Sequence, residues 1–179
     1  MNNSLLLLGE FSEQDILWLQ QFCQRIDLKA GEVLIQEGVP IEMLYFLLEG
    51  RLTVKVLSSN NHDRHRMLAN LTPGEIIGEM SFIDRRPPSA TVIANSEAVL
   101  LAIPHALLAQ RTEEDIDFGR RFYRGLAYCL SNRLRLMNVS LPQAGIEVSG
   151  TVPSEFANSE VAAKLPVAQA RLETLIASI

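Results

Sequence analysis

Glycines divide residues 28–104 into short runs of apolar residues, and this spacing constrains the fold more than any other feature of the sequence. The dividing residues are Gly31, Gly38, Gly50, Gly74 and Gly78. Tight turns between strands require positive φ angles, which glycine adopts without a steric penalty. The pattern predicts strands over residues 33–36, 44–48, 51–57, 64–71, 75–77, 89–95 and 97–103. Short strands at this close spacing indicate a sandwich or a barrel.

A capping box marks the helix that precedes this β-rich region. Ser12 is followed three residues later by Asp15, and the two side chains can bond reciprocally to backbone N–H groups. Apolar residues then recur at helical spacing as far as Ile26. The sequence therefore predicts a helix over residues 11–27.

A long helix is predicted after the β-rich region. Pro104 suits the first turn of a short helix that ends near Arg111. Thr112 and Asp115 then form a second capping box, which opens a helix over residues 112–137. The first turns of this helix are acidic and its later turns are basic, which suits the helix dipole.

The chain is therefore expected to consist of a domain over residues 1–137 and a tail over residues 138–179. The first part of the tail, residues 138–160, contains Pro, Gly and Ser without periodicity and is interpreted as a linker. Pro166 then begins a short helix with an apolar face, formed by Ala168, Leu172, Leu175, Ile176 and Ile179. A short helix needs a surface to pack on, and either this chain or a protein partner could supply it.

Composition and charge narrow the classes of function. The 179 residues are 47% hydrophobic and 21% charged, as in a globular domain, and the net charge of −5 offers nothing to attract nucleic acid. Cys23 and Cys129 lie far apart in helical patterns and are interpreted as reduced and buried. The run from Leu5 to Leu8 is too short for a signal peptide, and no run reaches transmembrane length. The expected location is the cytoplasm, without membrane contact.

One segment, residues 76–92, combines the end of a strand, a glycine, a short helical turn and a returning strand. Gly78 is followed by Glu79 and by a turn from Met80 to Phe82. The free N–H groups at the start of such a turn can bind an anion, whereas a carboxylate only accepts hydrogen bonds. The segment therefore suits a ligand that carries both a phosphate and hydroxyl groups.

This segment resembles the phosphate-binding cassette of the cyclic nucleotide-binding domain family. The matching residues are Gly78-Glu79-Met80-Ser81-Phe82 and Ser89-Ala90-Thr91-Val92. The resemblance covers roughly residues 11–137. It implies an α+β fold, with a β-roll or jelly roll of about eight antiparallel strands flanked by an N-terminal helix and a long C-terminal helix. It also implies a ligand site at Gly78, Glu79, Met80, Ser81, Ser89 and Ala90, in which Glu79 accepts the ribose 2′-hydroxyl.

Pro88 stands where the family has the arginine that binds the cyclic phosphate. Proline supplies neither a cation nor a backbone N–H, so we expect binding of cyclic AMP and cyclic GMP to be weak or absent. The predicted function is a stand-alone, non-enzymatic regulatory module. The alternative is a working sensor of a cyclic nucleotide or a related small ligand, in which Glu79 acts together with a substitute cation, Arg86 or Arg85.

No cofactor, metal or catalytic set is predicted. His62 and His65 form a His-x-x-His pair, but no third ligand is evident. No Ser/His/Asp or Cys/His combination suggests nucleophilic catalysis.

The long helix is the expected contact with a second copy of the chain, because the resemblance implies that role. Its seam would contain Tyr123, Leu126, Leu130 and Met137, although packing against the chain's own roll explains part of this stripe equally well. The helix arginines are expected to form a solvated face: Arg120, Arg121, Arg124, Arg133 and Arg135. DNA binding is not expected, because phosphate contacts need several cations and the tail has only Lys164 and Arg171.

Overall fold

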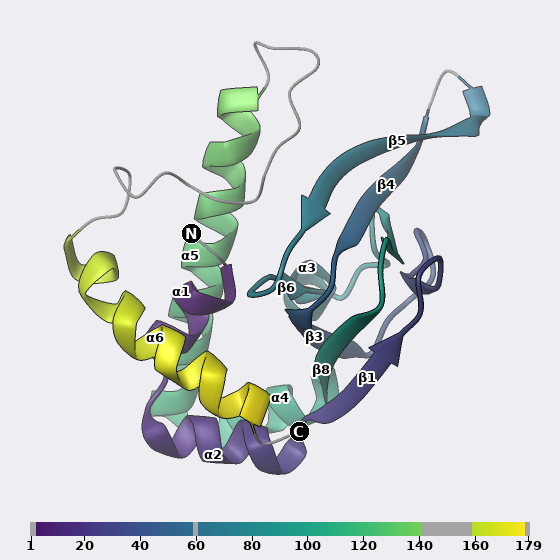
Figure 1. The fold of residues 1–179 in the computed structure, drawn as a ribbon. Coiled ribbons are helices and arrows are strands. Elements are labelled where there is room, and N and C mark those ends of the chain that lie inside the picture. The colour runs from purple at the N-terminus through teal and green to yellow at the C-terminus, as the bar shows by residue number, and fades with distance from the viewer. Residues whose placement is uncertain (1–2, 59–60, 141–158, 178–179) are drawn as a thin grey trace.

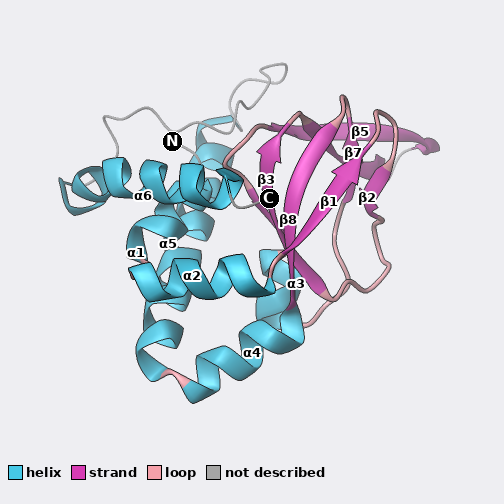
Figure 2. Ribbon diagram, turned by 60° about the horizontal axis from the view of Figure 1, so that its bottom comes forward, coloured by secondary structure: helices cyan, strands magenta, loops and turns pink. Residues whose placement is uncertain are grey.

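The computed structural model describes residues 3–58, 61–140 and 159–177, and it leaves the side chains of residues 58, 61–65 and 136–140 undescribed. Within these residues the fold is the predicted α+β roll, with eight strands beside a group of helices (Figures 1 and 2). Most of the predicted linker and Ile179 lie outside the described residues, as do the side chains of His62, His65 and Met137.

Two four-stranded antiparallel sheets form the roll. The first sheet has the order β1-β8-β3-β6, with β1 at Gln24–Leu28, β8 at Ala98–Pro104, β3 at Met43–Glu49 and β6 at Ile76–Ile77. The second sheet has the order β2-β7-β4-β5, with β2 at Val33–Ile35, β7 at Thr91–Ala94, β4 at Leu52–Ser58 and β5 at Asn61–Leu71.

Strand β3 is buried on both faces, which explains its almost continuous apolar sequence. Because side chains alternate along a strand, Leu44 and Phe46 face the helices while Leu47 faces the inside of the roll. Apolar residues of both sheets fill that inside: Ile35, Leu47, Leu52, Leu71, Ile77, Val92, Ala94, Ala98 and Leu100. Strands β3 and β8 therefore lie between the helices and the inside of the roll, and each contributes side chains to both apolar cores.

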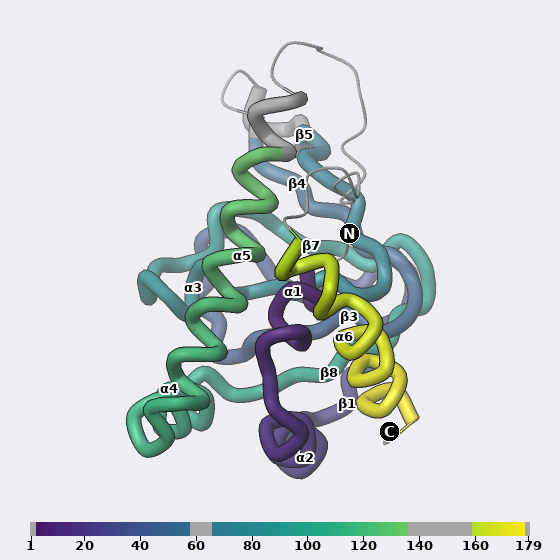
Figure 3. Tube along the Cα trace, turned by 90° about the vertical axis from the view of Figure 1, so that its left-hand side faces the viewer, coloured from purple at the N-terminus to yellow at the C-terminus, as the bar shows by residue number. Residues whose placement is uncertain are grey.

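Helices cover the outer face of the first sheet (Figure 2). They are α1 (Asn3–Glu10), α2 (Glu13–Phe22), α3 (Glu79–Asp84), α4 (His105–Glu114), α5 (Ile116–Ser140) and α6 (Ser159–Ala177). Helix α1 lies between α5 and α6 (Figure 3), and this position buries Leu6, Leu7 and Leu8. Among the described residues, none of these helices has the length and apolar character needed to cross a bilayer.

The predicted helix over residues 11–27 is correct at its start and wrong at its end. Asp15 N donates to Ser12 Oγ at 3.3 Å, and Ser12 N donates to Asp15 Oδ2 at 2.7 Å, which confirms the capping box. After α2, however, the chain forms β1, which pairs with β8 from Gln24 to Leu28. Ladder hydrogen bonds with β8 therefore override the local helical spacing. Helix α1 was not predicted at all.

The long helix α5 begins at Ile116, later than the predicted start at Thr112, because α4 continues to Glu114 and Asp115 separates the two helices. The N–H of Phe118 donates to Asp115 Oδ1 at 2.9 Å, so Asp115 supplies the cap of α5. Thr112, the predicted cap, instead donates from Oγ1 to the Ala109 carbonyl at 2.8 Å.

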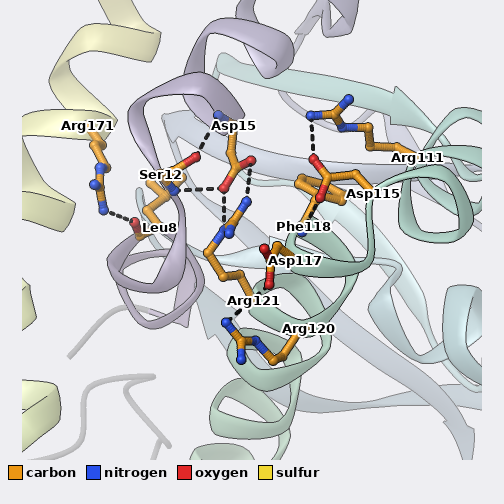
Figure 4. Close-up of polar contacts among 10 residues, drawn as sticks. All are labelled: Leu8, Ser12, Asp15, Arg111, Asp115, Asp117, Phe118, Arg120, Arg121 and Arg171. Carbon is orange, nitrogen blue, oxygen red and sulfur yellow. Dashed lines mark hydrogen bonds and ion pairs between the residues drawn. The ribbon is translucent and has the colours of Figure 1, made fainter.

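The C-terminal helix α6 is longer than predicted and packs on this chain. Pro166 lies inside the helix rather than at its start. Arg171 Nη1 donates to the Leu8 carbonyl at 2.9 Å (Figure 4), and Lys164 Nζ donates to Glu10 Oε1 at 2.7 Å. The sequence left open whether this chain or a protein partner supplies the surface on which this helix packs. In the structure, α1 of the same chain supplies it.

An ion pair joins α2 to α5. The Asp15 side chain is fully buried, and Arg121 donates to it from Nε at 2.7 Å and from Nη2 at 3.0 Å (Figure 4). Burial alone would raise the pKa of Asp15, but the hydrogen bonds from Arg121 and Ser12 outweigh it and hold that pKa below its ordinary value.

We expect this ion pair to stabilise the fold at neutral pH and to lose its effect in acid. Because the folded pKa of Asp15 lies below the unfolded value of about 3.9, the contribution is complete above the unfolded pKa and fades as the pH falls through the folded pKa. Arg121→Gln should lower the free energy of unfolding by about 2 kcal/mol at neutral pH, and by progressively less as the pH falls below the unfolded pKa of Asp15. Urea denaturation measures both values. Arg120→Gln is the control, because the Arg120 side chain is 75% exposed; equal losses from the two variants at neutral pH would refute the expectation.

Candidate functional site

The cassette joins β6 to β7 through the short helix α3. Gly78 precedes this helix with a φ of 90°, a left-handed conformation. A Cβ atom at this position would lie 2.8 Å from the Met43 carbonyl oxygen and 3.1 Å from Ile41 Cδ1. Both the backbone conformation and the close approach of β3 therefore require glycine here.

Glu79 is almost completely buried, and its carboxylate is already paired. The residue is 2% exposed, and its Oε1 accepts a charge-assisted hydrogen bond from Nη1 of Arg133 on α5. Arg133 also donates from Nη2 to the carbonyl oxygen of Ile76. A side chain of the long helix thus holds the acceptor that was predicted to bind a ligand hydroxyl.

A second buried carboxylate lies beside the same arginine. Glu75 is 1% exposed, and its Oε2 lies 3.7 Å from Arg133 Nη2. Burial raises the pKa of Glu75 and the charge of Glu79 adds to the rise, while Arg133 and a hydrogen bond from Asn3 oppose it without cancelling it. Two carboxylates therefore share one guanidinium, and Oε1 of Glu75 has no hydrogen-bond partner among the described residues.

The N-terminal helix completes this polar network. Asn3 Nδ2 donates to Glu75 Oε2 at 2.6 Å, and Asn3 Oδ1 accepts from Asn132 Nδ2 on α5 at 2.8 Å. Cys129 Sγ lies 2.9 Å from the Asn3 carbonyl oxygen, to which it donates. Glu75 is thus in contact with both α1 and α5, while Glu79 is bound by α5.

The loop after α3 keeps its arginines in solvent. The Arg86 side chain is 82% exposed, and within the described part of the chain its ion pair is with Asp84, at 3.9 Å. Arg85 adopts a left-handed φ of 56° and is exposed as well. Pro88 is half-buried, and its carbonyl oxygen accepts the N–H of Gly38 at 2.9 Å. Neither arginine reaches the paired carboxylate of the cassette.

The remaining predicted cassette residues differ in accessibility. Ser81 is buried inside α3, whereas Met80 and Ser89 are exposed and Ala90 is half-buried. At the start of β7, Thr91 Oγ1 accepts the N–H of Glu37 at 3.0 Å, which ties the returning strand to the loop between β2 and β3.

The sequence model of the cyclic nucleotide-binding domain matches residues 25–115, just over half of the chain. This chain belongs to the cyclic nucleotide-binding domain family. A cyclic AMP receptor protein from Thermus thermophilus is 32% identical over 150 residues, which are 82% of this chain and 65% of that protein. The Pycsar effector protein XpPycTIR from Xanthomonas perforans is 26% identical over 128 residues, which are 71% of this chain and 40% of the effector.

A solved structure supports the family assignment at the level of the fold. A cyclic nucleotide-binding domain from Methylobacillus flagellatus superposes with a TM-score of 0.70 at 24% identity, covering 80% of this chain and 84% of that chain. The present chain spans less than two thirds of the length of the Thermus and Xanthomonas relatives.

Residues of the predicted dimer seam occupy different environments in this cyclic nucleotide-binding domain. Leu126 is buried in the chain's own core, whereas Tyr123 is 49% exposed and Leu130 is half-buried. Leu134, four residues after Leu130, is exposed too. Self-association through α5 stays a prediction, and the exposed Tyr123 and Leu134, with the half-buried Leu130, are the residues available for it.

The prediction that the α5 arginines form a solvated face is wrong for Arg121 and Arg133. Both side chains are largely covered, and each pairs with a buried carboxylate. A sequence signal for Arg133 exists, since it follows Cys129 by four residues in the buried stripe of α5. Nothing in the sequence pattern marks Asn3 as a member of the site. In the described residues, no group of three or more His, Cys, Asp and Glu side chains is placed to hold a metal ion.

Proposed function

We propose that this chain is a non-enzymatic regulatory module whose cassette binds cyclic AMP and cyclic GMP weakly or not at all. The observation that carries the proposal is the pairing of the buried Glu79 with Arg133. A ligand hydroxyl must compete with a guanidinium for this carboxylate. The ligand's phosphate would then meet Pro88, which offers no cation.

The charges around the cassette support the same conclusion. Glu75 and Glu79 share the single positive charge of Arg133, so a phosphate would add a negative charge to an acidic site. A hydrogen bond to a charged partner contributes about 1.5–3 kcal/mol. Its loss weakens binding on the order of ten- to a few hundred-fold.

Cyclic AMP is the first ligand to test, because the Thermus relative is named a cyclic AMP receptor protein. Pro88→Arg restores a cation at the phosphate position, and we expect it to bind cyclic AMP at least roughly tenfold more tightly than the parent. Isothermal titration calorimetry of both proteins measures the difference. Pro87→Arg is the matched control, because it places the same cation one residue away on the exposed loop. Parent binding as tight as that of Pro88→Arg would overturn the proposal.

A working sensor is the second candidate, and the position of Arg86 favours it. The Arg86 side chain lies on the cassette loop and is 82% exposed, and in the part of the chain that the structure describes its ion pair is the 3.9 Å contact with Asp84, so it can turn toward a bound phosphate. In that case the parent binds cyclic AMP, and Arg86→Gln abolishes the binding in the same titration. If the first proposal is correct and the cassette binds cyclic AMP weakly or not at all, Arg86→Gln leaves the titration unchanged.

A further inference from the structure

His105 lies beside the cassette, at the junction between β8 and α4. Its backbone N–H donates to the carbonyl oxygen of Glu42 at 2.7 Å, and its imidazole forms a hydrogen bond with the backbone of Met43. The carbonyl oxygen of Met43 also lies next to Gly78, where a Cβ atom would approach it to 2.8 Å. The first residue of α4 therefore contacts the same part of β3 on which the cassette turn packs.

The His105 ring also packs against the cassette helix α3. Its centroid lies 5.4 Å from that of Phe82, and the planes of the two rings meet at 71°. Phe82 is buried, and its ring in turn lies 5.4 Å from that of Phe122 on α5. A titratable side chain from the start of α4 thus forms one side of the packing that holds α3 in place.

The Nε2 atom of His105 is buried and has no hydrogen-bond partner among the residues that the structure describes. A neutral imidazole tolerates this environment, because only one of its two ring nitrogens carries a proton. In a protonated imidazole both nitrogens are donors, so the ring would bury an unpaired N–H group together with a positive charge. The packing around His105 therefore suits the neutral ring and opposes the charged one.

Among the described residues, two charged side chains act on the imidazole. Arg85 follows α3 and Glu42 precedes β3, and both are exposed. Burial lowers the pKa of His105 most and the charge of Arg85 lowers it further, while the hydrogen bond with Met43 and the charge of Glu42 oppose the shift without cancelling it. The ring therefore takes up a proton less readily in the folded protein than in the unfolded chain.

We propose that His105 is a proton-sensitive support of the cassette helix: the neutral ring holds α3 against the start of α4, and protonation in mild acid loosens that contact. Because the folded pKa lies below the unfolded value of about 6.5, His105 costs no stability above the unfolded value. Stability is then lost progressively as the pH falls from the unfolded pKa to the folded one. The proton needs no nucleotide, so the cassette would respond to acid whether or not it binds cyclic AMP.

Urea denaturation of the full chain at about pH 7.5 and about pH 5.5, on either side of the ordinary histidine pKa, tests the proposal. His105→Gln cannot take up the proton, so its urea midpoint should fall less between the two pH values than that of the parent. Arg85→Gln removes the nearby cation and should also reduce the fall, which keeps the test decisive if His105→Gln does not fold. Arg86→Gln is the control and should match the parent, because the Arg86 side chain is 82% exposed and pairs with Asp84.

A pH titration followed by NMR shows where the proton acts. The imidazole resonance of His105 should titrate with a midpoint below about 6.5, and the amide resonances of residues 79–85 should shift with the same midpoint. In His105→Gln that common shift should be absent. The proposal is overturned if His105 titrates at or above its ordinary pKa, or if residues 79–85 do not follow it. Equal acid losses in the parent, His105→Gln and Arg85→Gln would overturn it as well.

Discussion

Phe122→Ala should lower the free energy of unfolding by about 3–5 kcal/mol, the range for removing a large aromatic side chain from a packed core. Phe122 is fully buried in α5 at the meeting point of several helices. Its ring lies 5.4 Å from that of Phe82 in the cassette helix, 5.7 Å from Phe118 and 6.3 Å from Phe11. The loss would be a large part of the stability of an ordinary domain, about 5–15 kcal/mol.

Tyr123→Ala is the control for this prediction. Tyr123 is the next residue of the same helix and also carries an aromatic ring, but it is 49% exposed. Its removal should cost about 1 kcal/mol or less. Urea denaturation of the parent and the two variants gives the three free energies. Equal losses would show that the aromatic cluster is not the core that joins α5 to the cassette.

Gly125→Ala should destabilise the fold by about 3 kcal/mol, at the upper end of the cost of overpacking a core. In an unpacked helix the same substitution would stabilise by roughly 1 kcal/mol. Here a Cβ atom would lie 2.5 Å from Leu7 Cδ1 and 2.9 Å from Leu7 Cα, so α1 would have to move away from α5. Asn3 also lies on α1, so the movement of α1 would strain the hydrogen bonds of Asn3 to Glu75 and Asn132.

The melting temperature of Gly125→Ala, compared with that of Ser131→Ala, tests the close packing of α1 against α5. Ser131 is exposed on α5, so its replacement by alanine should change stability by no more than about 0.5 kcal/mol. A Gly125→Ala variant as stable as the parent would mean that α1 and α5 do not approach as closely as the structure shows.

The strands were predictable because turn chemistry and alternation are local. Gly50 and Gly78 mark turns where only glycine fits, and the apolar runs between such turns became β3, β4 and β8. Residues 24–28 were not predictable in this way. They share helical spacing with α2, and only their pairing with β8, distant in sequence, makes them a strand.

In the cassette, too, the local features were predictable and the long-range contacts were not. The family motif located Gly78 and Glu79, and it marked Pro88 as the missing cation, because these positions are defined by neighbours in the sequence. The partner of Glu79 lies 54 residues away, on another helix, and Asn3 lies 72 residues from Glu75. Helical spacing places Arg133 in the buried stripe of α5, but no local pattern identifies the partner of a charged residue. Arg133 was therefore assigned to the solvated face of α5, when it is in fact a central contact of the site.

A thermal-shift titration of the unmodified chain with cyclic AMP tests the central claim most directly. A ligand that binds only the folded state stabilises it by RT ln(1 + [L]/Kd), about 2.7 kcal/mol at a hundredfold excess over Kd. With Glu79 held by Arg133 and Pro88 in place of the phosphate cation, we predict no change in melting temperature up to millimolar cyclic AMP. A concentration-dependent rise that disappears in Glu79→Ala would contradict the account, because it would show an open cassette with a working substitute for the missing arginine.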